Sequence, residues 1–455
     1  MVAYGGDEVN ALVFDMGSSM TRAGYAGEDT PRVMFPTSVG YIDIKQEEHS
    51  TVQPTDEDSV MTDADKPSLP TNERKYFIGD NKINVFRSQM EIKNPLKDGI
   101  VEDWEAVEQI WDFTFNNMLR IKPEEHPLLC TEPAWNTKEN REKTIEIAFE
   151  KFQFPAFYLA VDAVLTAFSV GRATALVLDS GGEVTSTVPV YDGFVLKKGV
   201  LHQPIAGNTL TEMIKTQLKN DLNYTITPRY KIAKMKKQTL EAGEQPEFEL
   251  RELEGLNDSF NEYQINRVIN EYKETVCQVS EVQYDEVLLS SRPKKSFGFP
   301  DGFNYSFGLE RYKVPELLFD PNMNDKSTET QEEEEEKEGK EKETTEKKKY
   351  LGAHEMVYNS INNCDIDLRP LLFNNVVVTG GNTLFNGFNE RLNYELPLKA
   401  PGSKIKIHAA GNATERKSSS WLGGSILASL GTFHQLWISR SEYDEFGASI
   451  VHRKC

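Results

Sequence analysis

The sequence predicts an α/β protein built from two related domains. Strand and helix signals alternate along the chain, which favours this class. Three short runs of buried-type strand, at 12–14, 176–178 and 376–378, each lead directly into a turn that contains glycine. A unit of strand, aspartate and glycine also occurs twice, 164 residues apart, as LVFDMGS at 12–18 and LVLDSGG at 176–182. The repeat predicts two similar domains that each present an aspartate at the end of a strand.

Helix signals separate these strands. Apolar residues recur at helical spacing in three segments, 104–119, 138–152 and 261–279. A helix after Gly207 is expected to begin with a capping box formed by Thr209 and Glu212, and a looser version of the same signal occurs at Ser441 and Asp444. These five helices complete the alternating pattern.

Composition indicates a globular protein with an acidic surface. The 455 residues are enough for about two or three domains. Hydrophobic residues make up 38% and charged residues 27%, so most of the chain should fold. The formal net charge of −21 would repel phosphates, so nucleic-acid binding by the bulk surface is disfavoured and basic partners such as histones fit better.

About half of this acidity lies in two segments that look inserted. Residues 41–73 hold nine acidic and two basic side chains, and residues 325–349 hold eleven acidic and seven basic ones. The part from 47 to 72 has few large apolar residues and is expected to form a flexible loop. The second segment is of low complexity and is expected to be a solvated helix or disordered.

Cysteine usage and the N-terminus indicate a reducing compartment. The four cysteines show no C-x-x-C spacing, so neither a zinc site nor a disulfide framework is expected. The first eight residues contain Asp7 and Glu8 and no basic residue, so we expect no signal peptide. The longest apolar stretch, 157–170, is interrupted by Asp162 and is too short to span a bilayer. A cytosolic or nuclear protein without a membrane partner is therefore expected.

The repeated turn has the chemistry to bind phosphate. Glycine lets successive backbone N–H groups converge on phosphate oxygens, and Ser18 and Ser19 could add hydroxyl donors. Asp15 and Asp179, facing each other across a cleft, would suit a magnesium ion bound to a nucleotide. Arg22 could neutralise phosphate charge. The alternative is two ordinary junctions of strand and turn, where aspartate and glycine are common.

A third glycine turn favours the nucleotide interpretation. Three valines at 376–378 lead into Gly380, Gly381 and Asn382, followed by apolar residues at helical spacing. A strand, a glycine turn and a helix N-terminus together form an anion-binding arrangement. The sequence contains neither a P-loop nor a G-x-G-x-x-G motif, so a P-loop ATPase and a Rossmann dehydrogenase are disfavoured. The three turns predict a nucleotide cleft between two domains.

These motifs resemble those of actin over nearly the whole chain outside the two inserted segments. Residues 15–27 (DMGSSMTRAGYAG) and 179–182 (DSGG) are similar to its two phosphate hairpins, and 380–382 (GGN) to its adenosine turn. The C-terminal sequences WLGGSILASL at 421–430 and VHRKC at 451–455 are also close to those of actin. The length of these motifs makes a chance match untenable.

The opening sequence YGGDEV at 4–9 and the two acidic inserts are more similar to the fourth class of nuclear actin-related proteins. That class belongs to chromatin remodelling and histone acetyltransferase complexes. The resemblance implies a nuclear structural subunit that pairs with actin on an amphipathic scaffold helix of a remodeller ATPase or acetyltransferase subunit. Histones or the nucleosome are further implied partners.

The resemblance also implies an actin-type fold, in which two lobes each contain a mixed sheet with flanking helices. The first lobe would comprise 1–169 and 421–455, with the insert at 41–73. The second lobe would comprise 170–420, with the insert at 325–349. ATP and a divalent cation, Mg²⁺ or Ca²⁺, would bind in the cleft between them.

Site residues follow from the resemblance, position by position. The phosphates would be held by Gly17, Ser18, Ser19, Met20, Arg22, Gly181, Gly182 and Glu183. The nucleoside would be held by Gly207, Lys273, Glu274, Gly380, Gly381, Asn382, Phe385 and Lys417. Asp15 and Asp179 would organise the metal, largely through water.

Three positions near the phosphates depart from actin. Where actin has the glutamine and histidine that position the attacking water, this chain has Asp162 and Ser186, and Gly182 replaces an aspartate. We therefore expect ATP binding with slow or absent hydrolysis, and no role as an enzyme. The alternative is an active ATPase or kinase of the actin, Hsp70 and sugar-kinase superfamily, with Asp162 as the base.

This chain matches actin at one partner-binding surface and differs from it at the surface that makes filament contacts. The groove in which partner helices dock on actin corresponds to Phe168, Ile426, Leu427, Leu430 and Thr432. The inserts lie in regions where actin makes filament contacts, and they add ordering entropy and charge repulsion to self-assembly. A monomer or heterodimer is expected, and a filament-forming actin is a third alternative.

Overall fold

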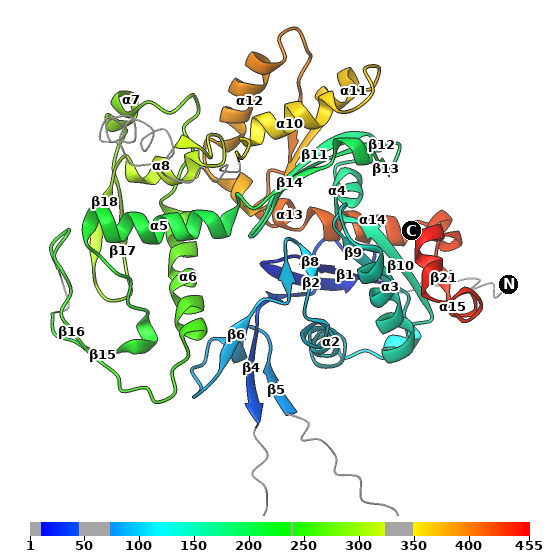
Figure 1. Cartoon of the computed structure of the whole chain (residues 1–455), viewed down its shortest axis with the longest axis horizontal. Helices are drawn as coiled ribbons and strands as arrows, with labels where there is room; N and C mark the ends of the chain where they lie inside the picture. Colours follow the sequence, from blue (N-terminus) through cyan, green and yellow to red (C-terminus); the bar gives the residue numbers. More distant parts are fainter. Residues whose placement is uncertain (1–10, 45–72, 238–239, 324–348) are drawn as a thin grey trace, which may run out of the picture.

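The computed structural model describes residues 11–44, 73–237, 240–323 and 349–455. Two lobes lie side by side in Figure 1, and each is built on a mixed six-stranded sheet with helices packed against it. This architecture confirms the predicted fold class, a two-lobed α/β fold of the actin type. The predicted lobe boundaries are not tested separately and stay a prediction.

The first sheet has the strand order β21-β10-β9-β1-β2-β3. Its central strand β1 pairs antiparallel with β2 and parallel with β9. The strands are β1 (Leu12–Met16), β2 (Met20–Tyr25), β3 (Val33–Pro36), β9 (Leu128–Glu132), β10 (Ala156–Val161) and β21 (Ile438–Ser439). A strand from the end of the chain therefore completes the sheet that the beginning of the chain starts.

The second sheet repeats this pattern. Its order is β13-β12-β11-β19-β20, with β14 also paired to β12. The central strand β11 pairs antiparallel with β12 and parallel with β19. The strands are β11 (Ala175–Ser180), β12 (Thr185–Tyr191), β13 (Phe194–Val195), β14 (Leu201–Gln203), β19 (Val376–Thr379) and β20 (Ile407–Ala409). The sequence repeat thus corresponds to the same hairpin at the centre of each sheet.

Smaller sheets extend from both lobes. From the first lobe, β4 pairs with β5 and β6, and this sheet points away from the lobe in Figure 1. Its strands and the neighbouring ribbon are β4 (Val39–Ile44), β5 (Glu73–Phe77), β6 (Glu91–Lys93), β7 (Leu96–Lys97) and β8 (Ile100–Val101). The second lobe carries the hairpins β15 (Ile232–Met235) with β16 (Phe248–Leu250) and β17 (Lys295–Gly298) with β18 (Asn304–Phe307).

The expected helices are present, with two errors in how they begin. Helices form at α2 (Trp104–Asp112) with a π-helical continuation to Leu119, α3 (Lys138–Glu146) with one to Lys151, α5 (Gly207–Leu222) and α6 (Asp258–Thr275). The capping box predicted at Thr209 is wrong, because its hydroxyl donates to the Pro204 carbonyl and the N-cap is Ala206. The box predicted at Ser441 lies two residues earlier, at Ser439, and begins α15 (Arg440–Phe446).

Of the remaining helices, α1 belongs to the first lobe, and the others lie in the second lobe and at the end of the chain. They are α1 (Asp80–Ile83), α7 (Glu286–Ser290), α8 (Glu310–Glu316), α10 (Ala353–Asn362), α11 (Arg369–Phe373), α12 (Phe388–Lys399), α13 (Ala413–Lys417) and α16 (Val451–Lys454). A helix N-terminus was expected directly at the third glycine turn. That expectation is wrong, because a 3-10 turn (Gly381–Leu384) follows the glycines and α12 begins only at Phe388.

Two helices join the lobes between the two main sheets. Helix α4 (Asp162–Ser169) places Ala163 and Ala167 against the valines of the second sheet. Helix α14 (Ser419–Ser429) places Trp421 against Val13 of the first sheet. The two helices touch through Gly423, where any side chain would overlap the Leu165 carbonyl. Because this contact leaves no space, the two helices pack closely against each other where the lobes join.

Some predictions lie outside the described residues. These are the opening segment 4–9, the loop at 47–72 and nearly all of the charged segment 325–349. All four cysteines are free thiols, and three of them are buried. None of the described helices is both long enough and apolar enough to cross a membrane.

Candidate functional site

The first hairpin, between β1 and β2, is closed by its own backbone. The Gly17 N–H donates to the Met20 carbonyl at 3.1 Å. The Gly17 carbonyl accepts from the Thr37 hydroxyl at 2.6 Å, and the Ser19 carbonyl accepts from the Thr37 N–H at 3.1 Å. The Ser18 carbonyl accepts from Asn94 Nδ2 at 2.5 Å. The carbonyls of the turn are therefore all used within the first lobe.

The second hairpin, between β11 and β12, has the same turn. The Gly181 N–H donates to the Val184 carbonyl at 3.0 Å, which repeats the bond of the first turn 164 residues later. The Gly181 carbonyl accepts from the Gly207 N–H at 3.1 Å, and the Gly182 carbonyl accepts from the Asn208 N–H at 2.6 Å. The beginning of α5 therefore holds the carbonyls of this turn.

The two hairpins meet at their tips. A Cβ atom placed on Gly182 would lie 3.2 Å from Ser19 Cβ and 3.7 Å from the Ser19 backbone nitrogen. The backbone N–H groups of Ser18, Ser19, Gly182 and Glu183 have no acceptor within the described parts of the chain. Free N–H groups on two facing glycine turns are the arrangement that backbone anion sites use.

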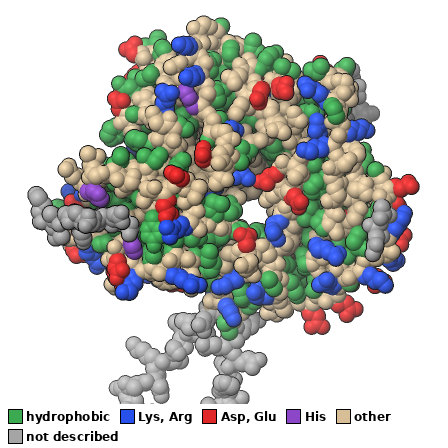
Figure 2. All heavy atoms as spheres, turned by 180° about the vertical axis from the view of Figure 1, so that it is seen from behind, with side chains coloured by type: hydrophobic (Ala, Val, Ile, Leu, Met, Phe, Trp, Pro, Cys, Tyr) green, Lys and Arg blue, Asp and Glu red, His purple; other side chains and the backbone are tan. Residues whose placement is uncertain are grey.

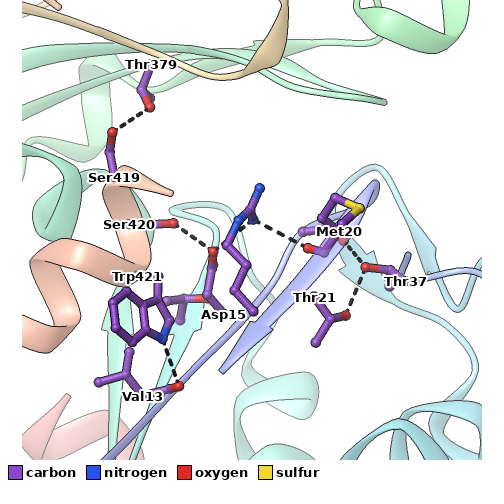
Figure 3. A network of polar contacts seen from close by, with 12 residues as sticks. Val13, Asp15, Met20, Thr21, Thr37, Thr379, Ser419, Ser420 and Trp421 are labelled. Carbon is purple, nitrogen blue, oxygen red and sulfur yellow. Dashed lines mark hydrogen bonds and ion pairs between the residues drawn. The ribbon is translucent and has the colours of Figure 1, made fainter. Parts of the chain in front are cut away.

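Asp15 accepts from three side chains that come from different parts of the chain. Its carboxylate accepts from the hydroxyl of Thr131 at 2.8 Å. It also accepts from the hydroxyl of Ser420 at 2.9 Å, the contact drawn in Figure 3. Arg22 Nη1 lies 3.2 Å from the same carboxylate and also donates to the Met20 carbonyl at 3.4 Å. Arg22 therefore lies against Asp15 in this structure, although a direct phosphate contact was predicted.

Two further carboxyl groups face Asp15. Burial raises the pKa of Asp179 to about 6, and the negative charge of Asp15 adds to this effect while Arg22 opposes it. Burial also raises the pKa of Asp162 well above its ordinary value, and Asp179 raises it further. Asp162 is the first residue of α4, and its Oδ1 accepts from the Ala163 N–H at 2.6 Å. A positive ion at this point would stabilise the ionised forms.

The third turn packs against the second hairpin. Gly380 has a φ of +92°, and a side chain there would collide with Asp179 Oδ1 and the Ser180 carbonyl. Asn382 Nδ2 donates to Ser180 Oγ at 3.1 Å and to the Gly181 carbonyl at 2.7 Å. The predicted turn residues are thus brought directly beside Asp179, and only glycine fits at position 380.

The predicted nucleoside residues lie on α5, α6 and α13. Lys273 Nζ is buried and donates to the Gly207 carbonyl and to Thr211 Oγ1, both at 2.8 Å. Burial lowers the pKa of Lys273 to about 8. Lys417 and Glu274 form an exposed ion pair at 2.8 Å. Phe385 is half-buried and packs against the core of the second lobe.

These residues fit a bound nucleotide and cation. The free N–H groups of the two hairpin tips suit phosphate oxygens, and Gly182 and Gly380 let the neighbouring turns approach each other closely. No group of three or more His, Cys, Asp or Glu in the described ranges is placed to hold a metal ion alone. Since Asp15 already accepts three bonds, a cation here would depend on phosphate and water ligands.

The predicted partner groove lies where α14 ends beside α4. Ile426 and Leu430 are exposed, as is Thr432, while Leu427 and Phe168 are half-buried. Gly193, in the turn between β12 and β13, lies next to the Phe168 ring. The structure thus brings the five residues together on α4 and the end of α14, beside the turn between β12 and β13.

Comparison with known proteins agrees with this geometry. The family model described as Actin matches residues 6–455. The chain belongs to the actin family. Within that family it is 40% identical to "Actin-related protein 4" of Yarrowia lipolytica, with 99% of this chain and 97% of that protein covered. It is 38% identical to proteins of the same name from Arabidopsis thaliana and Mycosarcoma maydis, each covering 99% of this chain. The chain is therefore an actin-related protein of this type.

Several residues of this actin-family site were missed in the sequence. Thr131 and Ser420 bind Asp15, and Asn94 and Thr37 fix the first hairpin. Single Ser, Thr and Asn residues are too common to single out, and these contacts span up to 405 residues of sequence. Ser186, which was singled out, is buried on β12 directly opposite Asp179 in the strand register.

Proposed function

We propose that this actin-related protein binds ATP with a divalent cation between its lobes and serves as a non-filamentous nuclear subunit. Its setting would be chromatin remodelling and histone acetyltransferase complexes. One observation supports the proposed binding of a nucleotide. Two similar hairpins from the two lobes meet at Ser19 and Gly182, and the N–H groups at their tips have no acceptor within the described residues. Figure 2 shows an opening through the molecule between the lobes, which gives such a ligand a place.

Each lobe would hold one side of the nucleotide. The tips 18–20 and 182–183 would hold the phosphates, and Asp15 and Asp179 would orient water around the cation. Gly380, Asn382 and Lys273 would contain the nucleoside. When bound, the nucleotide would link the two lobes through its phosphates and stabilise the folded chain by mass action.

Slow or absent hydrolysis is part of the proposal. A raised pKa keeps a larger share of Asp162 protonated, and a protonated carboxyl does not accept a proton from water. Ser186 offers a hydroxyl in place of a base. The second candidate, an ATPase or kinase, would need Asp162 ionised, and a nearby cation is the feature that favours it.

The partners proposed are actin, an amphipathic scaffold helix and basic histone surfaces. The exposed Ile426 and Leu430 beside half-buried Phe168 suit the apolar face of a helix. The net charge of −21 fits basic partners. The relatives named "Actin-related protein 4" support the class, and the acidic inserts support a protein that does not form filaments.

Two assays on the full chain test the proposal. Tagged protein purified from nuclei should carry near-equimolar actin and a large scaffold protein, quantified by mass spectrometry. In a single-turnover assay, phosphate release should be far slower than from polymerising actin measured in parallel. If phosphate is released as fast as from actin and Asp162→Asn abolishes this release, the protein would be an active ATPase or kinase and the proposal of a structural subunit would be wrong. Sedimentation of the chain alone in polymerising salt would contradict the non-filamentous state.

A further inference from the structure

The N–H groups at the tip of the first hairpin belong to peptide bonds whose carbonyls are held on the opposite side. In a planar trans peptide, the carbonyl of one residue and the N–H of the next point in opposite directions. The N–H groups of Ser18 and Ser19 therefore lie opposite the carbonyls of Gly17 and Ser18. Both carbonyls accept hydrogen bonds from side chains of the first lobe. The group that holds each carbonyl thus decides where the N–H on the other side points.

The second hairpin follows the same rule with a different set of donors. Its N–H groups at Gly182 and Glu183 lie opposite the carbonyls of Gly181 and Gly182. Both carbonyls accept from backbone N–H groups at the beginning of α5, and the Gly181 carbonyl also accepts from Asn382 Nδ2 at 2.7 Å. The first hairpin differs, because side chains alone hold the two carbonyls behind its tip, and side chains can be changed one at a time.

Asn94 holds the Ser18 carbonyl with a side chain that is itself fixed. Asn94 lies between β6 and β7, and its Nδ2 donates to that carbonyl at 2.5 Å. Its Oδ1 accepts from the Leu96 N–H at 3.0 Å. The following residue, Pro95, restricts the Asn94 backbone to an extended conformation, and the Pro95 carbonyl accepts from the Glu102 N–H at 3.0 Å. The amide therefore presents its donor to Ser18 in one orientation.

Thr37 holds the Gly17 carbonyl in a similar way. It is fully buried between β3 and β4, and its hydroxyl donates to that carbonyl at 2.6 Å. The Thr37 N–H donates to the Ser19 carbonyl at 3.1 Å. The hydroxyl also lies 2.9 Å from Thr21 Oγ1, a contact drawn in Figure 3. Three consecutive carbonyls of the turn are therefore held by the first lobe.

The other side of these peptide bonds is turned to the second hairpin. The Ser19 backbone nitrogen lies 3.7 Å from a Cβ placed on Gly182. Donors that are already oriented bind a charged group without the cost of reorganisation. We infer that Asn94 and Thr37 are positioning residues, which aim the Ser18 and Ser19 N–H groups at the phosphates of the ligand. This role rests on the proposed nucleotide site, and it assigns two residues that act through the hairpin.

Two neutral substitutions in the full chain each remove one of these donors. Asn94→Ser keeps an oxygen that can accept from the Leu96 N–H, but its hydroxyl is one bond shorter than the amide and does not span to the Ser18 carbonyl. Thr37→Val keeps the branched shape of the side chain and loses the hydroxyl. Neither substitution adds a charge, so neither repels the phosphates directly.

The matched controls remove the same kind of bond elsewhere in the first lobe. Asn140→Ser removes the bond from Nδ2 to the Val101 carbonyl, at 3.0 Å. Thr114→Val removes the bond from a fully buried hydroxyl to the Ile110 carbonyl, at 2.7 Å. Thermal unfolding of all four variants establishes which of them fold, and the two test variants decide independently.

Calorimetric titration of nucleotide-free protein compares two ligands that share the nucleoside. Mg-ATP uses the phosphate site, and adenosine does not. Asn94→Ser and Thr37→Val should each weaken Mg-ATP binding about tenfold, because hydrogen bonds to a charged group depend on oriented donors. The affinity for adenosine should change by less than about twofold, and so should both affinities in the controls. A general defect in the fold would weaken both ligands together.

The possible results separate the positioning role from the proposed function. Wild-type affinity for Mg-ATP in the folded test variants overturns the positioning role and leaves the proposed function intact. A parallel loss of affinity for Mg-ATP and adenosine overturns it too, since the two residues would then support the fold alone. If the wild-type chain binds no Mg-ATP, the proposed function is wrong and the positioning role falls with it.

Discussion

Gly182 of the second lobe lies directly against Ser19 of the first, so closely that one added methyl group would stand 3.2 Å from Ser19 Cβ. The distance is shorter than ordinary van der Waals contact between carbon atoms. The tips of the two hairpins are thus in direct contact, although the two residues lie 163 apart in the sequence.

Gly182→Ala should weaken ATP binding. The new methyl group forces the hairpins apart by a few tenths of an ångström, and such overpacking costs about 1–3 kcal/mol. We expect the affinity for Mg-ATP, measured by calorimetric titration, to fall about tenfold or more. Gly411→Ala is the control, because no atom lies within 4 Å of a Cβ at that position. Equal affinities of wild type and Gly182→Ala would show that the tips do not set the site.

Lys273 should make the free energy of unfolding increase with pH in the alkaline range. Burial lowers its pKa from 10.5 in the unfolded chain to about 8 in the folded one. Below pH 8 the ammonium is charged in both states, and folding carries the cost of desolvating it. As pH rises from 8 to 10.5 the folded state loses this proton first, so the free energy of unfolding gains up to about 3 kcal/mol.

The comparison with Lys273→Met isolates this effect. Urea unfolding of both chains at pH 7.5 and pH 10 should show wild type gaining stability relative to the variant. Tyrosine and surface lysine titrations are shared by the two chains and cancel in the difference. Parallel stability profiles over this range would mean that Lys273 is not desolvated by folding.

Arg391→Ala should destabilise the second lobe strongly. The Arg391 guanidinium donates two hydrogen bonds to the Glu316 carboxylate, at 2.9 and 2.7 Å, and both side chains are almost fully buried. Removing Arg391 leaves the Glu316 carboxylate buried without its partner, which costs about 3–5 kcal/mol. Lys122→Ala breaks the exposed pair with Glu125 and should cost less than about 1 kcal/mol. A similar loss for both, measured by urea unfolding, would contradict the difference in burial.

Ile426→Asp should prevent binding of the scaffold helix without unfolding the chain. Ile426 is 38% exposed on α14 within the proposed groove, so a carboxylate there meets solvent in the free chain and an apolar helix in the complex. We expect the scaffold protein recovered in tagged purification to fall at least about tenfold. Leu398→Asp is the control, because Leu398 is 64% exposed on α12 outside the proposed groove, and it should leave recovery unchanged. Equal recovery with both variants would place the helix elsewhere.

The hairpins were predictable from sequence because their chemistry is local. Aspartate at a strand end, followed by glycine, specifies the turn within a few residues, and the repeat doubles the signal. The partners of Asp15 were not predictable, because Ser420 reaches it only after the whole chain has folded. The Thr209 capping box failed for a related reason. The helix begins where the Gly207 N–H binds the second hairpin, and this tertiary contact overrides the local capping signal.

An apolar cluster that spans the two lobes illustrates the limit of sequence patterns. Phe77, Met90 and Phe260 each look like ordinary core residues of their own element. Only the packing of β5 and β6 against α6 shows that they belong to one boundary. Burial across two lobes depends on the angle between them, which no periodicity along the chain encodes.

The nucleotide content of the purified full-length chain tests the central claim most directly. Protein purified in Mg²⁺, without added nucleotide, is denatured, and the released bases are quantified by chromatography. We expect close to one adenine nucleotide per chain, mostly ATP, since the lobes retain it and hydrolyse it slowly. A chain that releases no nucleotide and shows no saturable binding after prolonged incubation with Mg-ATP would contradict the claim.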